Sequence, residues 1–341
     1  MKAEALLPAI AYGDALGLPV EKKTREEIAE IYGKVTQLED ITSNPFLGEH
    51  PAGTTSDDTQ LSVAVAESII SSYGINMRDI ASRHIKAFLE SDMGWGGSTR
   101  NSMKRLQEGM DFRRSGEPEG KGNGVLMKMA PLTAHIVRNS SLLGDRTEVL
   151  DMFTRMTHDN DLSVVTSLVH HEVCTGLLRG KLDHEEVPAY AAFVARWAEK
   201  RYPGAASEVS RLLGNLASLG QIDPDAIVAL APRGGFYAPE TLIMAYGSFA
   251  LEPIFPASAV EAVNLGGDAD SISSVVSAMS VMYQNEVVMP ADINKIKDLE
   301  RLKKLSTFVF GRVEDNGRTV SFTIPTETGW ISTTQDLVDH I

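Results

Sequence analysis

Two acidic clusters that lie far apart in the sequence each stand directly before a strongly apolar stretch. Residues 56–59 read Ser-Asp-Asp-Thr and residues 266–271 read Gly-Gly-Asp-Ala-Asp-Ser, so each cluster contributes two carboxylates beside small hydroxyl side chains. Carboxylates that lie close together raise one another's pKa, so four of them need a positive charge among them at neutral pH. Hard divalent cations prefer such all-oxygen ligand sets. Whether the fold brings the two clusters together therefore decides whether the chain has a metal site.

Each cluster is expected to occupy the first turn of a helix, over residues 57–72 and 270–284. Helix capping is an alternative explanation, since Ser and Asp satisfy free backbone N–H groups there and favour the helix dipole. A cap needs one acceptor, so the second Asp of each cluster is surplus, which favours metal ligation. An aspartate-nucleophile phosphatase is a weaker interpretation of the Asp-Ala-Asp sequence. That chemistry needs a hydrophobic strand directly before the motif, where this chain has two glycines.

The hydrophobic pattern of the chain is mostly that of helices. Start and stop signals predict helices over residues 24–33, 57–72, 76–90, 99–108, 145–157, 161–179, 185–200, 205–219, 239–250 and 270–284. The alternation typical of a strand is found at 319–324, and the stretches 40–56 and 110–125 read as long loops. We therefore expect an all-α fold, with a single large helical domain over residues 1–305. A small C-terminal appendage over residues 306–341 is expected to hold the strand.

The net charge of −14 and the single cysteine exclude several classes of function. An acidic chain is not expected to bind nucleic acid or an anionic membrane surface, because phosphate binding needs a basic face. With Cys174 alone, an intrachain disulfide and thiolate zinc sites are excluded, and its apolar surroundings predict a buried side chain. No segment resembles a membrane span or a signal peptide. We expect a cytoplasmic protein.

Further segments carry side chains suited to a binding cleft. The glycines after residue 12 and Pro19 predict a helix that ends in a turn, which places Glu21 in an irregular segment where a carboxylate can face a cleft. Residues 122–124 (Gly-Asn-Gly) allow backbone N–H groups to approach a phosphate or sugar oxygen. His158 stands between two predicted helices, and Tyr237 follows a glycine pair in a loop where its ring can stack on a base. Taken singly, these are equally well explained as a solvated glutamate, a loop, a core histidine and an interhelical turn.

Taken in order, these segments resemble the ADP-ribosylglycohydrolase family, whose founding members release ADP-ribose from modified arginine on proteins such as dinitrogen reductase. The resemblance covers roughly residues 5–285, and five motifs in the same order make it specific. The matching motifs are residues 13–17 with Glu21, residues 56–59, residues 122–124 with Met127, Pro131 and Leu132, the Thr157-His158 pair, and residues 264–271.

The resemblance implies an all-α fold with a binuclear magnesium or manganese site in a cleft. It implies a role beside the scissile ribose for Glu21, and we assign catalysis to Glu21 together with Asp57 and Asp268. The implied metal ligands are Ser56, Asp57, Asp58, Asp268, Asp270 and Ser271. The substrate-binding residues that we expect are Gly122, Asn123, Gly124, Met127, His158 and Tyr237.

A few positions depart from the family pattern. Ser56 and Ser271 stand where Thr is usual, and both keep a hydroxyl oxygen for ligation. Lys128 stands where Arg is common after the Met, which alters contacts near the glycine loop. The tail from Gly311 onward matches nothing in the pattern, and a terminal appendage can reshape the rim of a cleft.

Together these residues predict a metal-dependent glycohydrolase that cleaves the ribosyl bond of an ADP-ribosylated protein or of a related ADP-ribose conjugate. Such cleavage passes through an oxocarbenium-like transition state, so the leaving group must be protonated and water supplied to C1. Two alternatives stay open: hydrolysis of a small nucleoside-like N-riboside, and a non-catalytic ADP-ribose-binding protein. Retention of four aspartates and Glu21 favours catalysis, because clustered charge is costly to keep. Both Mg²⁺ and Mn²⁺ suit such oxygen sites.

Overall fold

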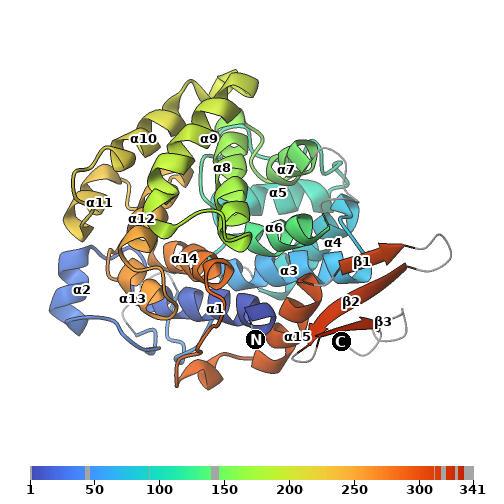
Figure 1. The fold of residues 1–341 in the computed structure, drawn as a ribbon, viewed down its shortest axis with the longest axis horizontal. Helices are drawn as coiled ribbons and strands as arrows, with labels where there is room; N and C mark the ends of the chain where they lie inside the picture. The colour runs from blue at the N-terminus through green and yellow to red at the C-terminus, as the bar shows by residue number, and fades with distance from the viewer. Residues whose placement is uncertain are drawn as a thin grey trace.

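Two central helices, α1 (Lys2–Gly17) and α14 (Ala269–Tyr283), pack side by side in the computed structural model, although they come from opposite ends of the chain. The structure describes residues 2–42, 47–91, 93–139, 146–310, 312–315, 320–326 and 329–333. Figure 1 shows α1 directly below α14. Residues 269–282 of α14 are all buried. Their small and apolar side chains allow this, since Asp270 is the one charged residue among them.

Two glycines one turn apart bring α1 close to α14. A Cβ atom at Gly13 would lie 2.6 Å from the carbonyl oxygen of Ser273, and one at Gly17 would collide with the backbone of Asp270. Any larger side chain would push the two helices apart, because protein interiors are already close-packed. The glycines therefore hold the first turn of α14 against the C-terminal end of α1.

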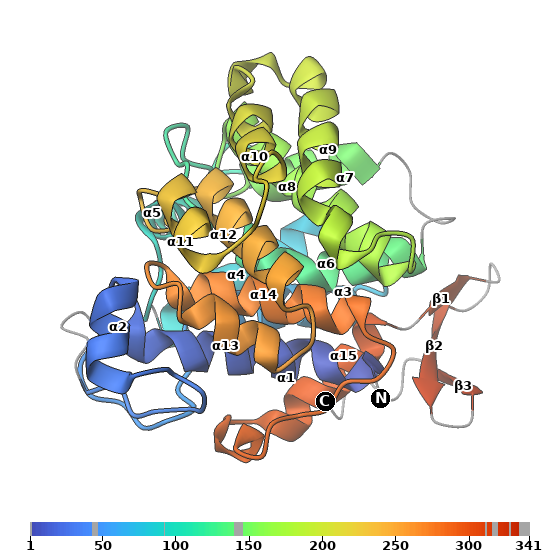
Figure 2. The same cartoon turned by 60° about the vertical axis from the view of Figure 1, so that its left-hand side comes forward.

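Further helices surround this pair. α3 (Asp57–Ser71), α13 (Ala257–Val263) and α15 (Leu299–Val309) pack on α1, while α8 (Asp161–Leu178) and α12 (Ala238–Leu251) pack on α14. The other α-helices of the described chain are α2 (Arg25–Tyr32), α4 (Met77–Glu90), α5 (Gly97–Gln107), α6 (Met129–Arg138), α7 (Arg146–Arg155), α9 (Val187–Arg201), α10 (Glu208–Ala217) and α11 (Pro224–Leu230). Short 3-10 helices are η1 (Leu18–Val20), η2 (Leu126–Lys128), η3 (His184–Glu186), η4 (Pro203–Ala205) and η5 (Ile293–Lys295). Figure 2 shows α9 and α10 at the end of the molecule farthest from α1.

The all-α prediction is confirmed, and most of the predicted helices are present with ends that differ by a few residues. Thr24 caps α2 with a capping box, and the side chain of Asn76 caps α4, each at the start of a predicted helix. Cys174 is buried, as predicted. Helices α11, α13 and α15 are absent from the sequence prediction, as is α6. Helices α11 and α13 have seven residues each, too few to show a clear helical period, and the residue before α15, Asp298, makes no side-chain cap. The predicted start of the helix over residues 145–157 lies outside the described residues.

Strands follow α15. β1 (Arg312–Asp315), β2 (Val320–Thr326) and β3 (Gly329–Thr333) form an antiparallel sheet in the order β1-β2-β3. The strand expected at 319–324 corresponds to β2, and its two neighbours are additions to the prediction. Residue 305, where we expect the helical domain to end, lies within α15. The division of the chain into two domains stays a prediction.

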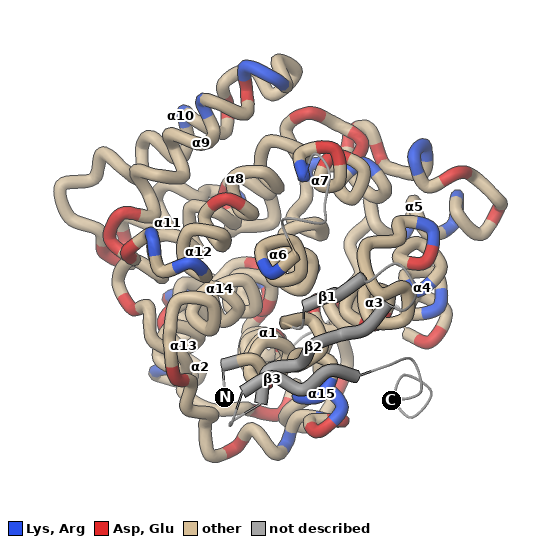
Figure 3. Tube along the Cα trace, turned by 45° about the vertical axis from the view of Figure 1, so that its right-hand side comes forward, with Lys and Arg blue, Asp and Glu red and all other residues tan. Residues whose placement is uncertain are grey.

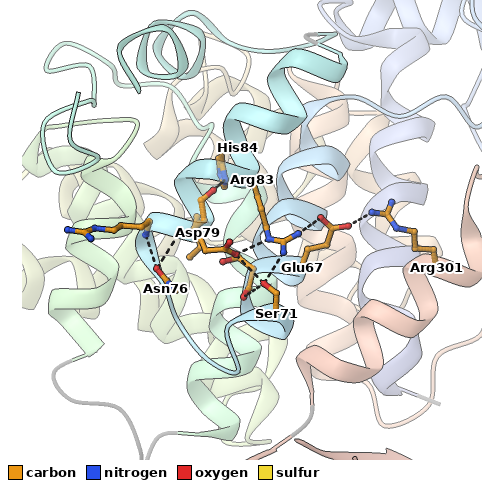
Figure 4. A network of polar contacts seen from close by, with 10 residues as sticks. Glu67, Ser71, Asn76, Asp79, Arg83, His84 and Arg301 are labelled. Carbon is orange, nitrogen blue, oxygen red and sulfur yellow. Dashed lines mark hydrogen bonds and ion pairs between the residues drawn. The ribbon is translucent and has the colours of Figure 1, made fainter. Parts of the chain in front are cut away.

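Charged side chains tie the outer helices together. Arg83 on α4 donates to Glu67 on α3 (2.9 Å) and to Asp79 (2.8 Å), and Arg301 on α15 pairs with the other carboxylate oxygen of Glu67 (Figure 4). Lys and Arg are interspersed with Asp and Glu along the outer helices in Figure 3. Among the described residues, helices with the length and apolar character needed to cross a membrane are absent.

Candidate active site

The two acidic clusters meet where α3 and α14 begin. The hydroxyl of Ser271 donates to one carboxylate oxygen of Asp58 (3.2 Å), and the hydroxyl of Ser274 donates to the other (2.5 Å). The first of these bonds joins residues 213 positions apart in the chain. Both helices pack on α1, which brings their first turns together. The structure thus places both clusters in one buried site.

Asp14, inside α1, adds a fifth carboxylate that the sequence prediction leaves out. Its oxygens accept hydrogen bonds from the backbone N–H and hydroxyl of Ser56 (2.9 and 2.8 Å) and from those of Thr59 (3.1 and 2.5 Å). The Asp14 side chain is fully buried. The available signals were its place in the matched motif 13–17 and its position as the one charged residue in residues 5–17 of α1. Its partners are on α3, so the packing of α1 against α3 gives Asp14 its place in the site.

The carboxylates form two overlapping sets of three residues, here called groups. In each group, one oxygen from each of the three residues lies within 4.8 Å of the other two. One group consists of Asp14, Asp58 and Asp270, and the other of Glu21, Asp268 and Asp270. Glu21 reaches the second group from the turn after η1, which is held in place because the next backbone N–H donates to the carbonyl oxygen of Gly267 (2.7 Å). Asp270 is common to both groups and therefore couples them.

Burial raises the pKa of the carboxyl groups contributed by α1, α3 and α14. It is the largest cause of each shift, and it raises the pKa of Asp14 to about 6 and that of Asp268 to about 7. The pKa values of Asp57, Asp58 and Asp270 are raised well above the usual range, because neighbouring carboxylates add their repulsion to the effect of burial. Within the described residues, Oδ1 of Asp270 is buried and has no hydrogen-bond partner. Clustered acceptor-only oxygens, one of them unpartnered, fit a hard divalent cation that supplies the missing positive charge.

A cavity of about 230 Å³ lies against these carboxylates. Three of the expected site residues, Ser56, Asp58 and Tyr237, are not among its lining residues, and Ser56 and Asp58 lie beneath it in the hydrogen-bonded centre. All of the other expected residues line the cavity. Its lining residues are Glu21, Asp57, Gly94, Gly96, Gly97, Ser98, Thr99, Gly122, Asn123, Gly124, Met127, His158, Phe236, Asp268, Asp270 and Ser271.

Tyr237 is expected to line the cavity, but it faces away from it. Phe236 lies at the cavity in its place. The Tyr237 ring lies 4.2 Å from the guanidinium carbon of Arg233, and its hydroxyl is hydrogen-bonded to Glu208. Tyr237 has extended backbone at the start of α12, where successive side chains point in opposite directions. Phe236 therefore faces the cavity, with 38% of its surface exposed.

Asn123, expected to bind substrate, contacts the acidic centre itself. Its side-chain amide donates to Asp268 (2.7 Å) and to the carbonyl oxygen of Gly235 (3.4 Å). The Gly-Asn-Gly loop therefore orients one of the carboxylates that share the site, in addition to lining the cavity beside it.

A glycine-rich loop before α5 forms a wall of the cavity that the sequence prediction leaves out. Gly94 has a φ of +81°, and a Cβ atom there would lie 2.6 Å from Oδ1 of Asp57. The loop is anchored by Trp95, whose buried indole N–H donates to Gln60 (2.9 Å). The glycines are visible in the sequence, but the contact of Gly94 with Asp57 depends on how α5 packs on α4, which in turn packs on α3. Gly94 is required where the loop backbone touches the carboxylate.

The fold and this site define an all-α protein in which a buried carboxylate centre, suited to divalent cations, lies beside a cavity. The chain belongs to the ADP-ribosylglycohydrolase family, whose sequence model matches residues 2–316. It is therefore a hydrolase of glycosyl bonds. The resemblance seen in the sequence motifs is confirmed.

The chain is also similar to several individual proteins. The chain is 26% identical over 303 residues to an uncharacterized protein of Archaeoglobus fulgidus, covering 88% of this chain and 93% of that protein. It is 24% identical over 323 residues to the ADP-ribosylarginine hydrolase Tri1 of Pseudomonas putida, covering 91% and 78%. It is 28% identical over 168 residues to the ADP-ribosyl-(dinitrogen reductase) glycohydrolase of Rhodospirillum rubrum, covering 48% and 54%. A solved structure of an ADP-ribosylglycohydrolase-related protein complex matches with a TM-score of 0.69 at 23% identity, covering 91% of this chain and 96% of that one, and so shares its fold.

Proposed function

We propose that this protein hydrolyses the ribosyl bond of an ADP-ribosylated protein or of a related ADP-ribose conjugate. The observation that carries the proposal is the presence of two sets of three carboxylates, both including Asp270. They lie beside a cavity that Glu21 also lines. Two relatives are named as a hydrolase of ADP-ribosylarginine and as a glycohydrolase of ADP-ribosyl-dinitrogen reductase, which supports an ADP-ribose conjugate as the substrate.

The acidic centre would hold two divalent cations, Mg²⁺ or Mn²⁺. Two sets of three carboxylates that have one residue in common support a pair of ions, one for each set. The chemistry such ions supply when bound is orientation of the ribose hydroxyls and a lower pKa for a bound water. The hydroxyls of Ser56 and Ser271 direct their protons at Asp14 and Asp58, which leaves oxygen lone pairs for coordination. The ligands in this proposal are Ser56, Asp57, Asp58, Asp268, Asp270 and Ser271, with Asp14 and Glu21 beside them.

Glu21 is the residue placed to transfer a proton or to position water. Its side chain is 11% exposed, and one of its oxygens lies 3.3 Å from Nζ of Lys22. Departure of the acceptor from an oxocarbenium-like transition state needs a proton on the leaving group and water at C1. A positioned carboxyl group typically contributes about 10²–10⁴-fold to such a step.

The remainder of the cavity suits the distal part of an ADP-ribose group. Backbone N–H groups at glycines 122 and 124 can approach phosphate or sugar oxygens. Phe236 is half-exposed and presents a ring face to a base. These side chains bind and orient the ligand, while the carboxylate centre and Glu21 act at the ribose to be released.

A substrate panel tests this function. Purified protein and its Asp57→Ala/Asp268→Ala variant are incubated with ADP-ribosyl-arginine, ADP-ribosyl-serine, O-acetyl-ADP-ribose and common nucleosides, each with magnesium, manganese or chelator. Asp225→Asn is the matched control, because that carboxylate is 89% exposed on α11. Metal-dependent release of ADP-ribose that is lost in the double variant and kept in the control is expected, and it identifies the linkage.

Other outcomes of the panel lead to different assignments. Release of ribose from nucleosides alone would make the protein a hydrolase of small N-ribosides. An increase in Tm with ADP-ribose, without turnover of any substrate, would make it an ADP-ribose-binding protein. Equal turnover by the wild type and the double variant would refute the roles given to Asp57 and Asp268.

A further inference from the structure

Lys128 is a fully buried lysine outside the carboxylate centre. It ends η2, directly before α6, and its side chain has no exposed surface. Its Nζ atom donates to Oγ1 of Thr157 (3.3 Å) and lies 5.2 Å from the centroid of the Phe153 ring. Burying an ammonium group costs free energy, so an apolar side chain would fill this space at lower cost if packing were its whole role.

Lys128, Thr157 and His158 are joined by two consecutive hydrogen bonds. An ammonium group only donates, so the Thr157 hydroxyl oxygen is the acceptor in the first bond. Its own proton is then available for the second bond, to Nδ1 of His158 at 3.0 Å. A ring nitrogen that accepts carries no proton, and a neutral imidazole holds its single proton on the other nitrogen. Burial, together with the charge of Lys128, lowers the pKa of His158 to about 3, so the ring is neutral near pH 7.

The Nε2 edge of His158 faces the glycine loop of the cavity. Cβ atoms placed on Gly122 and Gly124 would lie 3.9 and 3.7 Å from Nε2, and all three residues line the cavity. Within the described part of the chain, Nε2 makes no hydrogen bond. An N–H group at this position suits a sugar or phosphate oxygen, whereas a lone pair there would repel it.

We propose that Lys128 and Thr157 are positioning residues that hold His158 in its Nε2–H tautomer, so that the ring donates a hydrogen bond to a ligand oxygen in the cavity. The inference rests on the proposed function for its ligand, ADP-ribose. The tautomer itself is a property of the ligand-free protein. The two parts are therefore tested separately.

The tautomer is tested by NMR of the ligand-free protein labelled with ¹⁵N-histidine, with His158 assigned by the signals lost in His158→Gln. Spectra are recorded at pH 6, because burial lowers the pKa of Lys128 to about 7 and its ammonium form predominates below that value. The wild type is expected to show a protonated Nε2 and an unprotonated Nδ1. Lys128→Met, which keeps an unbranched side chain without the donor, is expected to show both tautomers, and Lys128→Arg to retain the Nε2–H form. A wild-type ring protonated on Nδ1, or a Lys128→Met spectrum identical to that of the wild type, overturns the inference.

The effect on the ligand is tested by calorimetry with ADP-ribose. Loss of one hydrogen bond is expected to raise the Kd about 2-fold to 12-fold in Lys128→Met. Lys128→Arg is expected to restore it. If Lys128→Met does not fold, Thr157→Val and its control Thr157→Ser make the same comparison, since Ser keeps the hydroxyl. Unchanged affinity in a variant whose NMR spectrum shows both tautomers overturns the ligand contact. Absence of ADP-ribose binding by the wild type refutes the proposed function, and the NMR result still decides the tautomer.

Discussion

Asp270→Asn is expected to stabilise the metal-free protein and to abolish its stabilisation by metal. Asp270 has a buried oxygen without a hydrogen-bond partner within the described residues, and it is the carboxylate common to both groups. An amide of the same size leaves no cavity and is not repelled by Asp58, Asp268 and Glu21. Its NH₂ group can donate to those carboxylates. The same change removes the shared carboxylate from the proposed cation site.

The gain expected from Asp270→Asn in chelator is about 1–5 kcal/mol at pH 7.5, bounded by two estimates. An unsatisfied buried polar atom costs about 1–3 kcal/mol, which gives the lower bound. Keeping Asp270 protonated costs about 1.4 kcal/mol for each pH unit above a reference pKa near 4, or about 5 kcal/mol at pH 7.5. Burial and the neighbouring charges raise the pKa of Asp270 above its unfolded value. Its contribution to stability is therefore present at low pH and is lost as the pH rises, so the gain from Asn is smallest at pH 4 and largest near neutrality.

Thermal unfolding from pH 4 to pH 7.5, with chelator and with magnesium, measures both effects. At roughly 2 °C per kcal/mol for a domain of this size, Asp270→Asn should unfold about 2–10 °C above the wild type in chelator at pH 7.5. Magnesium at about 100 times its Kd should add about 2.7 kcal/mol to the stability of the wild type and nothing to that of the variant. The reasoning is refuted if the metal-free variant unfolds below the wild type, or if magnesium stabilises both proteins equally.

Three other substitutions test separate parts of the structure. Gly94→Ala places a Cβ against Asp57 at a positive φ, so it should lower stability by about 1–3 kcal/mol and weaken magnesium binding; unchanged magnesium affinity by calorimetry would contradict the contact. Glu67→Gln removes the charge paired with two arginines, each pair contributing about 0.2–1 kcal/mol, so Tm should fall by up to about 4 °C. That decrease should shrink in high salt, and a salt-independent loss would point to another cause. Glu21→Gln keeps one oxygen in its set of carboxylates and leaves the six proposed ligands unchanged, so it should weaken magnesium binding much less than Asp270→Asn does. It should reduce turnover about 10²–10⁴-fold, and full activity would exclude the role given to Glu21.

The parts of the fold that depend on nearby residues could be predicted from the sequence. The capping box of Thr24 and the cap of Asn76 are closed by hydrogen bonds to residues two or three positions along the chain, so the sequence contains both partners side by side. Helices whose ends lack such bonds could not be recognised in this way. α15 is an example, since Asp298 at its start has a φ of +57° and makes no side-chain cap.

The residue types of the site were also visible, whereas several of its partners were not. The paired aspartates stand out because a helix cap needs only one acceptor, and the order of the five motifs adds Glu21 and the Gly-Asn-Gly loop to them. Asp14 is the one charged residue in residues 5–17 of α1, and its role depends on Ser56 and Thr59 at the start of α3. Which of the two neighbouring aromatic residues, Phe236 or Tyr237, faces the cavity depends on the backbone direction at the start of α12.

The amino-acid sequence by itself determined which chemistry is available: carboxylate and hydroxyl oxygens at two helix starts, a glutamate in a turn, and glycine loops beside them. It also determined that the chain is helical, because caps and apolar periodicity act over a few residues. Only the tertiary structure decided that the two clusters meet, that their carboxylates form two sets sharing Asp270, and that Asp14 joins one of these sets. Those distances are set by the close contact of α1 with α14 at Gly13 and Gly17, which joins segments from opposite ends of the chain and therefore leaves no local pattern in the sequence.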